Sequence, residues 1–379
     1  MSLRPLKIAW LLPSTFFYWQ PSICKLAEIF PDTKIFTALW CGFAPGLEDK
    51  VLVEIVGSRK EMVYAESVEG YDSKFAYLSP KIISHLLAFK PDVVFSNSFG
   101  LWTLLALLSK PLGHWRVVIA YEGSSPSVDY RNSSARLLLR RTMLSLCDAC
   151  VSNSDAGRRY LVEVLDAQPD KVSVQPYEVP DASILRMQSD APIVSKALRK
   201  PVFLFVGHII ARKGLQWLLK ACLCLKQLGK TNYTIMVVGD GPQKSELEKY
   251  CATHELSDNF HWVGRVQYEA LSAYFKCADV FILPTLEDTW GVVTQEAMIL
   301  GLPVLCSELA GSKELIEEGK NGYCFHPENP ERMAMLMARF IDEPTLADSM
   351  GSYAQNAIKQ YSPEAAAGFM KAVAENVMK

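Results

Sequence analysis

The densest group of reactive side chains lies in the segment LPTLEDTWGVVTQEAM. An apolar run ends there in a proline, and the acidic pair Glu287 and Asp288 follows it. Gly291 then precedes a helix-like stretch, whose free N–H groups form a favourable site for phosphate. Glu296 lies about one turn into that stretch, close enough to bind ribose hydroxyls while the helix start holds phosphate. Acidic residues near a helix start also stabilise the helix, so each carboxylate has a purely structural explanation as well.

A pair of cations, Arg212 and Lys213, closes a second motif, FLFVGHIIARKG. A buried strand is expected to end at Gly207, and the loop after it presents both cations just before a helix. Such a pair suits a diphosphate, because Arg can bind two oxygens and Lys adds a mobile point charge. A solvated charged pair is the simpler alternative. Cations at a helix start oppose the helix dipole, which favours a functional role.

Three further motifs place glycine at a strand end or a loop. VGDGP, around Gly239, lets the backbone approach a ligand, although a plain turn is the commoner explanation of such a motif. WVGRV, which contains Arg265 and Val266, could present backbone groups to a base edge. The segment from Ala310 to Gly322 is a Gly-Ser loop that opens a helix.

These motifs must be positioned by the elements around them, which are short apolar runs alternating with amphipathic stretches. The pattern indicates parallel sheets covered on both faces, so the expected fold class is α/β with two doubly wound Rossmann-like domains. Ligands bind such sheets at the carboxyl ends of the strands, where the motifs fall. The predicted strands are 8–12, 92–96, 117–121, 149–153, 172–175, 202–206, 234–238, 260–263, 280–284 and 304–306. The predicted helices include 214–228, 242–254, 268–276, 292–300, 331–342, 345–360 and 363–378.

The proline-rich stretch between the two strand series predicts a domain boundary. We expect an N-terminal domain over 1–180, a linker over 181–200, a C-terminal domain over 201–360 and a C-terminal helix over 361–379.

Composition excludes several classes of protein. The 379 residues carry 39 Lys and Arg against 41 Asp and Glu, which gives no overall attraction to nucleic acid. No apolar run reaches the roughly 20 residues that a membrane span needs, and the first residues lack the cleavage site of a signal peptide. The six histidines form no metal-ligand cluster, and no convincing Asp-x-Asp pair is present, so no metal site is predicted.

The ten cysteines lie mostly in apolar runs, which is typical of buried thiols in a reducing compartment. Cys147 and Cys150 form a lone CxxC pair. A zinc or redox site would need a second pair or a helix N-terminus, and neither is near, so we expect both thiols to be core residues.

Taken together and in order, the five motifs resemble the C-terminal domain of retaining GT-B-fold glycosyltransferases of family 4, also described as glycosyl transferases group 1. The resemblance covers residues 200–379 well and reaches the first domain more weakly, through KPDVVF at 90–95 and the segment 147–161. It implies that 1–180 binds the acceptor, that 201–360 binds a nucleotide-sugar donor, and that helix 361–379 crosses back to the N-terminal domain.

The resemblance also implies roles for individual residues. Lys213 matches the family's diphosphate-binding lysine, whereas His208 stands where the family usually has arginine, and Arg212 supplies the charge instead. Glu296 matches the glutamate that binds ribose. Asp288 occupies the position of the glutamate that faces the transferred sugar, and its side chain is one methylene shorter; Glu287 is an alternative. Glu122 follows the strand at 117–121, where the family often has a histidine.

The expected catalytic residues are therefore Arg212, Lys213, Asp288 and Glu122. The expected donor-binding residues are Gly207, His208, Gly239, Arg265, Val266, Glu287, Thr289, Trp290, Gly291, Val292, Val293 and Glu296.

The resulting hypothesis is a cytoplasmic enzyme that moves a hexose-type sugar from a nucleoside diphosphate to a glycan, lipid-linked or small-molecule acceptor, with retention and without a metal or other cofactor. Two alternatives stay open: a GT-B nucleotide-sugar epimerase, and a non-catalytic nucleotide-sugar-binding subunit. A dinucleotide oxidoreductase is disfavoured, because no GxGxxG follows the first strand.

A peripheral contact with a membrane is also predicted. Arg136, Arg140 and Arg141 lie beside Leu137–Leu139 and Leu144 in a helix-like stretch, which would give a basic and apolar surface. An amphipathic helix with inward leucines is the alternative. The aromatic residues at 16–19 could contact sugar or lipid, or belong to the core.

Overall fold

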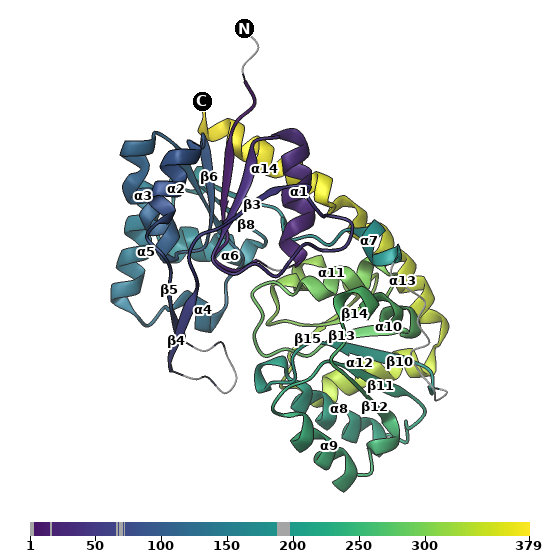
Figure 1. Cartoon of the computed structure of the whole chain (residues 1–379). Helices are drawn as coiled ribbons and strands as arrows, with labels where there is room; N and C mark the ends of the chain where they lie inside the picture. Colours follow the sequence, from purple (N-terminus) through teal and green to yellow (C-terminus); the bar gives the residue numbers. More distant parts are fainter. Residues whose placement is uncertain (1–3, 16, 66, 68–70, 72, 188–197) are drawn as a thin grey trace. The chain divides into compact units, whose positions relative to one another are not determined.

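The computed structural model describes residues 4–15, 17–65, 67, 71, 73–187 and 198–379 (Figure 1). By contacts the chain divides into two compact units. Unit 1 comprises Met1–Glu66, Asp72–Pro180 and Tyr361–Lys379, and unit 2 comprises Ser67–Tyr71 and Asp181–Gln360.

Unit 1 is built on a parallel sheet in the order β3-β2-β1-β6-β7-β8-β9. The order reverses between β1 and β6, which is the topological switch point of a doubly wound sheet. Its strands are β1 (Ile8–Leu11), β2 (Thr33–Thr37), β3 (Leu52–Ile55), β6 (Val93–Asn97), β7 (Arg116–Tyr121), β8 (Ala149–Ser152) and β9 (Val172–Val174). A separate antiparallel hairpin is formed by β4 (Lys60–Ala65) and β5 (Ser73–Tyr77).

Helices on both faces cover this sheet (Figure 1). They are α1 (Gln20–Ile29), α2 (Ile82–Phe89), α3 (Leu101–Gly113), α4 (Pro126–Asp129), α5 (Ser134–Leu146), α6 (Asp155–Arg159) and α14 (Pro363–Val377). Short 3-10 or π turns lie at Phe17–Trp19, Tyr160–Val164 and Pro169–Lys171. The last helix, α14, packs against α1 and is capped by Ser362, whose side chain accepts a hydrogen bond from Ala365 N at 3.2 Å.

Unit 2 has a second parallel sheet, in the order β12-β11-β10-β13-β14-β15. Its strands are β10 (Val202–Val206), β11 (Thr234–Val238), β12 (Phe260–Gly264), β13 (Val280–Leu283), β14 (Val304–Ser307) and β15 (Gly322–Phe325). Its helices are α7 (Ala182–Met187), α8 (Leu215–Gln227), α9 (Lys244–Thr253), α10 (Leu271–Cys277), α11 (Val292–Ile299), α12 (Pro330–Asp342) and α13 (Thr345–Ala357). Five 3-10 turns lie at Ala211–Lys213, Ser257–Asn259, Tyr268–Ala270, Gly311–Leu315 and Ile358–Gln360.

The prediction of two doubly wound Rossmann-like domains is confirmed. The strands form where they do because their residues are apolar on both faces; all five side chains of β11, for example, are buried. In the stretch expected to be a linker, α7 forms a helix that belongs to unit 2, and residues 188–197 of that stretch lie outside the described residues.

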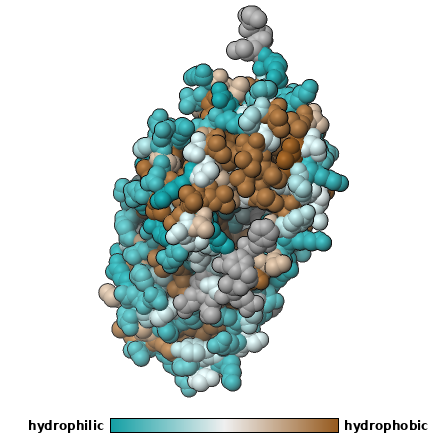
Figure 2. Space-filling view, turned by 90° about the vertical axis from the view of Figure 1, so that its left-hand side faces the viewer, coloured by the Kyte–Doolittle hydropathy of each residue, from teal (hydrophilic) through white to brown (hydrophobic). Residues whose placement is uncertain are grey.

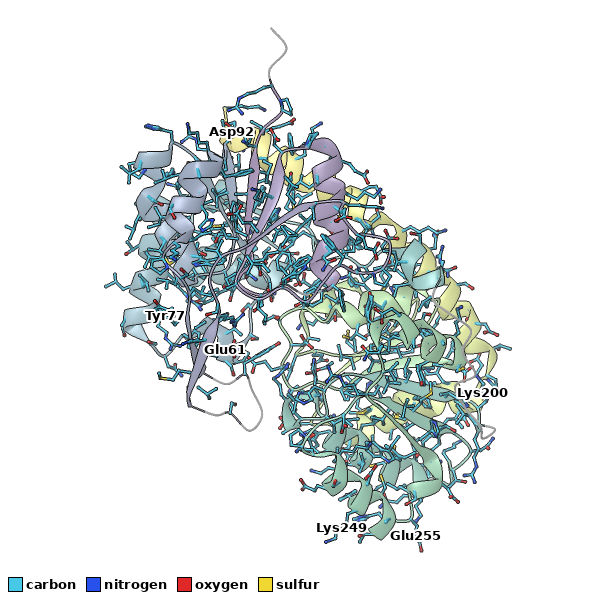
Figure 3. The ribbon with its side chains drawn as sticks, viewed as in Figure 1. Glu61, Tyr77, Asp92, Lys200, Lys249 and Glu255 are labelled. Atoms are coloured by element: carbon cyan, nitrogen blue, oxygen red, sulfur yellow. The ribbon has the colours of Figure 1, made fainter. Side chains whose placement is uncertain are left out.

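Ion pairs stabilise the amino ends of both sheets, away from the carboxyl ends where ligands bind. Asp92, labelled in Figure 3, accepts hydrogen bonds from the Arg4 side chain and from Lys7 N, each at 2.8 Å. Lys200, also labelled, pairs with Asp279 at 2.8 Å. Neither ion pair lies at the carboxyl edge, so neither belongs to a candidate ligand site.

The ten cysteines are free thiols. Cys147 and Cys150 are buried in the core of unit 1, with their sulfur atoms 3.7 Å apart. This burial agrees with the prediction that both thiols are core residues. Within the described ranges, no helix is long and apolar enough to cross a membrane.

Candidate functional site

The centre of unit 2 is the switch point between β10 and β13, where the strand order reverses. The loop after β10 carries Arg212 and Lys213, and the loop after β13 runs from Pro284 to Gly291. Because the two strands are parallel neighbours, both loops leave the sheet at the same carboxyl edge. The topology thus brings together the two motifs that carry the most reactive side chains.

Two direct contacts join these loops. The Arg212 guanidinium donates from Nη1 to the carbonyl oxygen of Glu287 at 2.6 Å. Lys213 Nζ lies 2.5 Å from Asp288 Oδ2, and the two side chains are 15% and 10% exposed. The low exposure strengthens this ion pair relative to one at the surface. The positive charge of Lys213 is therefore held in place and balanced by Asp288, and a donor diphosphate would compete with that carboxylate.

The backbone around the pair is fixed by hydrogen bonds and close packing. The carbonyl oxygen of Arg212 accepts from Leu286 N at 2.8 Å and from the Thr285 hydroxyl at 3.0 Å. Gly214 has a φ of +75°, and a Cβ there would lie 1.9 Å from the carbonyl oxygen of Pro284. Only glycine permits this approach, so the position of Lys213 depends on its neighbour's lack of a side chain.

Glycines also end the strands on the other side of the switch point. Gly207 N donates to the Val238 carbonyl at 3.0 Å, and Gly239 N donates to the Gly264 carbonyl at 2.8 Å. A Cβ on Gly239 would lie 1.9 Å from the carbonyl oxygen of Gly207. The carboxyl ends of β10, β11 and β12 therefore lie close together. His208 and Arg265, which follow two of them, are exposed, and Val266 is half-buried.

Helix α11 begins at this same edge, with Gly291 as its N-cap residue. Val292 and Val293 in its first turn are half-buried, as is Thr289 before it. The Trp290 side chain is 2% exposed, and its carbonyl oxygen accepts from Ser312 N at 2.7 Å. The expected donor-binding role of Trp290 therefore falls to its backbone, since its side chain is buried.

Glu296 lies on α11 and is 5% exposed. Burial raises its pKa to about 7, against the effect of a hydrogen bond from the Tyr268 hydroxyl, which favours the carboxylate. The carboxyl group is thus buried, paired with a phenol and able to change its charge near neutral pH. A ribose diol could take the place of the phenol, because both donate O–H hydrogen bonds.

The raised pKa predicts a pH dependence of stability. A carboxyl group whose pKa is higher in the folded state than its ordinary value stabilises the fold at pH values below that ordinary value, and the contribution is lost as the pH rises through about 7. We expect Glu296→Gln to be more stable than wild type at pH 8, by up to about 3 kcal/mol, and the difference to vanish near pH 5. Urea unfolding of both proteins across this range measures it.

Glu328→Gln, at an exposed position, is the matched control and should leave the difference near zero at every pH. A Glu296→Gln variant that is less stable than wild type at pH 8 would show that the carboxylate is the favoured form in the fold.

Tyr71 contributes to this site and was not predicted. It belongs to unit 2 by its contacts, and its ring lies over the Arg212 guanidinium, 3.9 Å from ring centroid to Cζ. It also hydrogen-bonds Thr289, and burial raises its pKa. The cation–π contact and the hydrogen bond to the Glu287 carbonyl both hold the Arg212 guanidinium, so Tyr71 is a positioning residue for that cation.

The carboxyl edge of unit 1 holds a cavity of about 640 Å³ at its own switch point. Ser14 follows β1, Asn97 ends β6 and Glu122 follows β7, and all three line the cavity. Asn97 Nδ2 donates to Glu122 Oε1 at 3.1 Å. Aromatic, aliphatic and arginine side chains complete the walls: Tyr18, Trp19, Arg59, Phe99, Leu101, Leu104, Val128, Tyr130, Arg136, Leu139, Arg140 and Met143.

The aromatic segment before α1 is part of this wall and of the core. Trp19 is 2% exposed, and its ring centroid lies 5.5 Å from those of Trp10 and Tyr177. The core alternative is therefore correct for Trp19, whereas Phe17 and Tyr18 are half-buried and Phe16 lies outside the described residues.

The predicted residues fall into two groups. Glu122 belongs to unit 1, and the other fifteen belong to unit 2, along the carboxyl edge of one sheet. Within unit 2 the structure joins Arg212 to Glu287 and Lys213 to Asp288, and it places Glu296 on the helix that starts beside them. Among the described side chains, no group of three or more His, Cys, Asp or Glu residues is arranged to hold a metal ion.

Two sequence-family models match this chain and together span most of it. The family described as "Glycosyl transferases group 1" matches residues 188–357, and the family described as "Glycosyltransferase Family 4" matches residues 41–178. The first match contains every predicted donor-site residue of unit 2.

Curated relatives are similar over a large part of the chain. A sulfoquinovosyl transferase of Arabidopsis thaliana is 28% identical over 307 residues, which cover 76% of this chain and 57% of that protein. A D-inositol 3-phosphate glycosyltransferase of Streptomyces griseus is 26% identical over 259 residues, which cover 62% of this chain and 53% of the relative. The chain thus spans little more than half the length of these relatives.

Solved structures share the fold over nearly the whole length. The HepE protein of Anabaena in complex with UDP superposes with a TM-score of 0.74 at 15% identity, covering 98% of this chain and all of that one. A glycosyltransferase from Rickettsia africae gives 0.76 at 14% identity, with full coverage of both chains. With both sequence families matched in order along one chain and the fold shared end to end, this protein belongs to the GT-B-fold glycosyltransferases of family 4.

Proposed function

We propose that the protein transfers a hexose-type sugar from a nucleoside-diphosphate sugar to an acceptor. The observation that carries the proposal is the cluster of Arg212, Lys213 and Glu296 at the switch point of unit 2. Two cations suited to a diphosphate and a buried carboxyl group suited to a ribose diol share one sheet edge, as a nucleoside diphosphate requires.

Each group has a defined part in donor binding. Lys213 and Arg212 bind the diphosphate, and the N–H groups at the start of α11 add to the positive potential there. Glu296 binds the ribose hydroxyls. Gly207, Gly239, Arg265 and Val266 lie at the strand ends that would surround the base and the phosphates. The structurally similar HepE protein was solved in complex with UDP, which supports a nucleotide donor for this chain.

For the chemical step we propose retention through front-face substitution. The bond between the anomeric carbon and the diphosphate oxygen breaks, and the acceptor oxygen bonds to the same face of that carbon. The acceptor proton passes to the leaving phosphate. Arg212 and Lys213 stabilise the charge that develops on the diphosphate. Asp288 is already paired with Lys213, which favours a role in orienting the sugar and the lysine over a role as nucleophile.

We propose that this cation pair balances the diphosphate without a divalent metal or other cofactor. Activity should therefore persist at full rate when EDTA is present throughout the assay. Turnover is measured with and without the chelator, and after addition of magnesium or manganese to the chelated enzyme. Complete loss of turnover on chelation, restored by either metal, would contradict the proposal.

The cavity of unit 1 is the proposed acceptor site, with Glu122 as a contact for the acceptor hydroxyl. Its mixed walls suit a glycan, a lipid-linked acceptor or a small polar molecule. We favour a lipid-linked acceptor reached from a membrane surface, because apolar and arginine side chains line the same cavity. The ten free thiols support a cytoplasmic location, and we propose that the enzyme acts there at the inner face of the cell membrane.

Product analysis tests the reaction. The protein is incubated with UDP-, GDP- and ADP-hexoses, alone and with a simple sugar, a glycan or a lipid-linked sugar as acceptor, and the products are identified by NMR. We expect a glycoside only when an acceptor is present, with the anomeric configuration of the donor. A new nucleotide sugar formed from the donor alone would instead support an epimerase, and donor binding with no product would support a non-catalytic subunit.

A further inference from the structure

The CxxC pair of unit 1 lines a cavity of its own. This cavity has a volume of about 360 Å³, and its walls come from the end of α5, from β8 and from the segment 165–171. Cys147 follows α5 directly, and Cys150 is the second residue of β8; both side chains contribute to the wall. Among the described residues, none lines both this cavity and the proposed acceptor cavity. The pair is therefore a feature that the transfer of a sugar does not use.

Polar side chains at the rim connect this cavity to water. Arg141 and Asp166 line it, form an ion pair at 3.0 Å and are 46% and 70% exposed. The outer side of α3 and α5 is different: Figure 2 views the molecule from the side on which these helices lie in Figure 1, and its upper part carries a broad apolar area. The cavity is many times larger than one water molecule. A small polar solute can thus reach both cysteines through the rim, although their side chains are only 4% and 1% exposed.

The two thiols form a hydrogen-bonded pair. Cys147 Sγ donates to the Leu144 carbonyl oxygen at 3.2 Å, and the sulfur atoms of Cys147 and Cys150 are 3.7 Å apart. Because the Cys147 proton is directed to Leu144, Cys150 is the donor between the two sulfur atoms. The sulfur atoms would need to approach by roughly 1.7 Å to form a disulfide bond, a movement within the reach of side-chain rotation.

The surroundings favour a thiolate on Cys147 over one on Cys150. The hydrogen bond from Cys150 lowers the pKa of Cys147, against the effect of burial. The same hydrogen bond, together with burial, raises the pKa of Cys150. Lys171 in the cavity wall and Lys110 also favour the Cys147 thiolate, whereas Asp148, which pairs with Lys110 at 2.7 Å, opposes it. The helix dipole does not help, because Cys147 lies at the end of α5, so the activating groups are the second thiol and the lysines.

Three other buried thiols have a different environment. Burial raises the pKa of Cys24, Cys222 and Cys251 to about 12. Such thiols are hardly ionised near neutral pH, and the thiolate is the form that reacts with peroxides. The fold therefore distinguishes Cys147 as a nucleophile, which goes beyond the core role predicted from the sequence.

We propose that Cys147 and Cys150 are a redox-active dithiol that a hydroperoxide oxidises to a disulfide. The Cys147 thiolate attacks the hydroperoxide: a sulfur–oxygen bond forms, the oxygen–oxygen bond breaks, and the second oxygen leaves as hydroxide or alkoxide and takes up a proton. The sulfur of Cys150 then attacks the sulfenic acid on Cys147. The sulfur–sulfur bond forms, the sulfur–oxygen bond breaks, and the hydroxide leaves as water with the Cys150 proton. The thiols lose two electrons, and the hydroperoxide is reduced to water and an alcohol, or to water alone when it is hydrogen peroxide.

Peptide mass spectrometry tests the proposal with the full chain. The native protein is reduced, freed of reductant and treated with a small excess of hydrogen peroxide at pH 7, and the remaining thiols are alkylated after denaturation. Trypsin cleaves after Arg141 and Arg158, so that peptide 142–158 contains both cysteines. We expect this peptide to lose two hydrogen atoms and both alkylation sites, at least about tenfold faster than Cys24, Cys222 or Cys251 is oxidised. A dithiol reductant should restore the original peptide.

Serine variants assign the two roles. Cys150→Ser keeps a donor beside Cys147 but removes the second sulfur, so peroxide should leave a sulfenic acid on Cys147 that dimedone traps. Cys147→Ser should give neither a disulfide nor a dimedone adduct on Cys150. The matched control Cys251→Ser removes another buried thiol, and Cys41→Ser removes an exposed one; both should form the disulfide at the wild-type rate.

The melting temperature of each variant under reducing conditions checks its fold, and Cys147→Ala and Cys150→Ala replace a serine variant that melts early. A native wild-type protein whose peptide 142–158 stays a dithiol, or oxidises no faster than the three buried thiols, overturns the proposal. Dimedone labelling of Cys150 in Cys147→Ser, at the rate of Cys147 in Cys150→Ser, overturns the assignment of Cys147 as the attacking thiol.

Discussion

Replacement of Lys213 by alanine is expected to lower turnover by roughly two to three orders of magnitude. Its ammonium group is the one whose charge a leaving diphosphate would meet, and the fold fixes it through Gly214 and the loop after β13. Steady-state kinetics with the true donor measures the loss. Lys220→Ala, on the exposed side of α8, is the control and should keep wild-type turnover.

A second variant separates chemistry from folding. Alanine at position 213 leaves Asp288 without its ion-pair partner at 10% exposure, which also destabilises the fold. The double variant Lys213→Ala/Asp288→Asn removes that uncompensated charge. We expect it to regain stability without regaining turnover. If both variants turn over at the wild-type rate, Lys213 has no part in catalysis.

Glu296→Ala should act mainly on donor affinity. Loss of the hydrogen bonds to the ribose hydroxyls is expected to weaken binding by about 1.5–3 kcal/mol, or roughly ten- to 150-fold in Kd, with a smaller effect on turnover. Calorimetric titration of the donor measures this difference. The pKa of about 7 adds a second signature: the wild-type affinity should fall as the pH decreases below 7, because the carboxylate that accepts the hydroxyl protons is lost.

The alanine variant should bind more weakly than wild type at high pH and lose this pH dependence. A variant whose affinity equals that of wild type at every pH would remove Glu296 from the donor site.

The sequence was most informative where a segment is apolar on both faces. Strands β10 and β11 have the predicted bounds, because every side chain in β11 is buried and four of the five in β10 are. Strands β2, β3, β15 and the β4–β5 hairpin were not predicted. The reason is clearest in β3, an edge strand whose Leu52 and Ile55 are exposed, so that it presents no continuous buried run.

The donor-side motifs were predicted as a set because each lies at a strand end, and parallel topology brings such ends to one edge. Their pairings were not predictable. Lys213 and Asp288 are 75 positions apart, and nothing local in either motif specifies that they meet. Tyr71 reaches Arg212 from a segment with no motif of its own. Only the tertiary fold reveals such contacts.

The orientation of α5 limited the prediction for the acceptor side. Arg140 and Leu144 are flanked in the sequence by further leucines and arginines. The pattern therefore does not show which face of the helix is buried. The structure resolves this choice through the Arg140 hydrogen bonds to the Asp129 carbonyl and the Tyr160 hydroxyl. The exposed face then falls on Leu138 and Leu139.

Unit 2 is expected to bind a nucleoside-diphosphate sugar through Lys213 and Glu296. A thermal-shift panel of UDP-, GDP- and ADP-sugars with wild type and with Lys213→Ala/Glu296→Ala tests it most directly, since a ligand that binds the folded state raises the melting temperature by mass action. We expect sugars of one nucleotide to raise the melting temperature of wild type and to leave that of the double variant unchanged. Equal shifts in both proteins, or no shift with any of the donors, would contradict it.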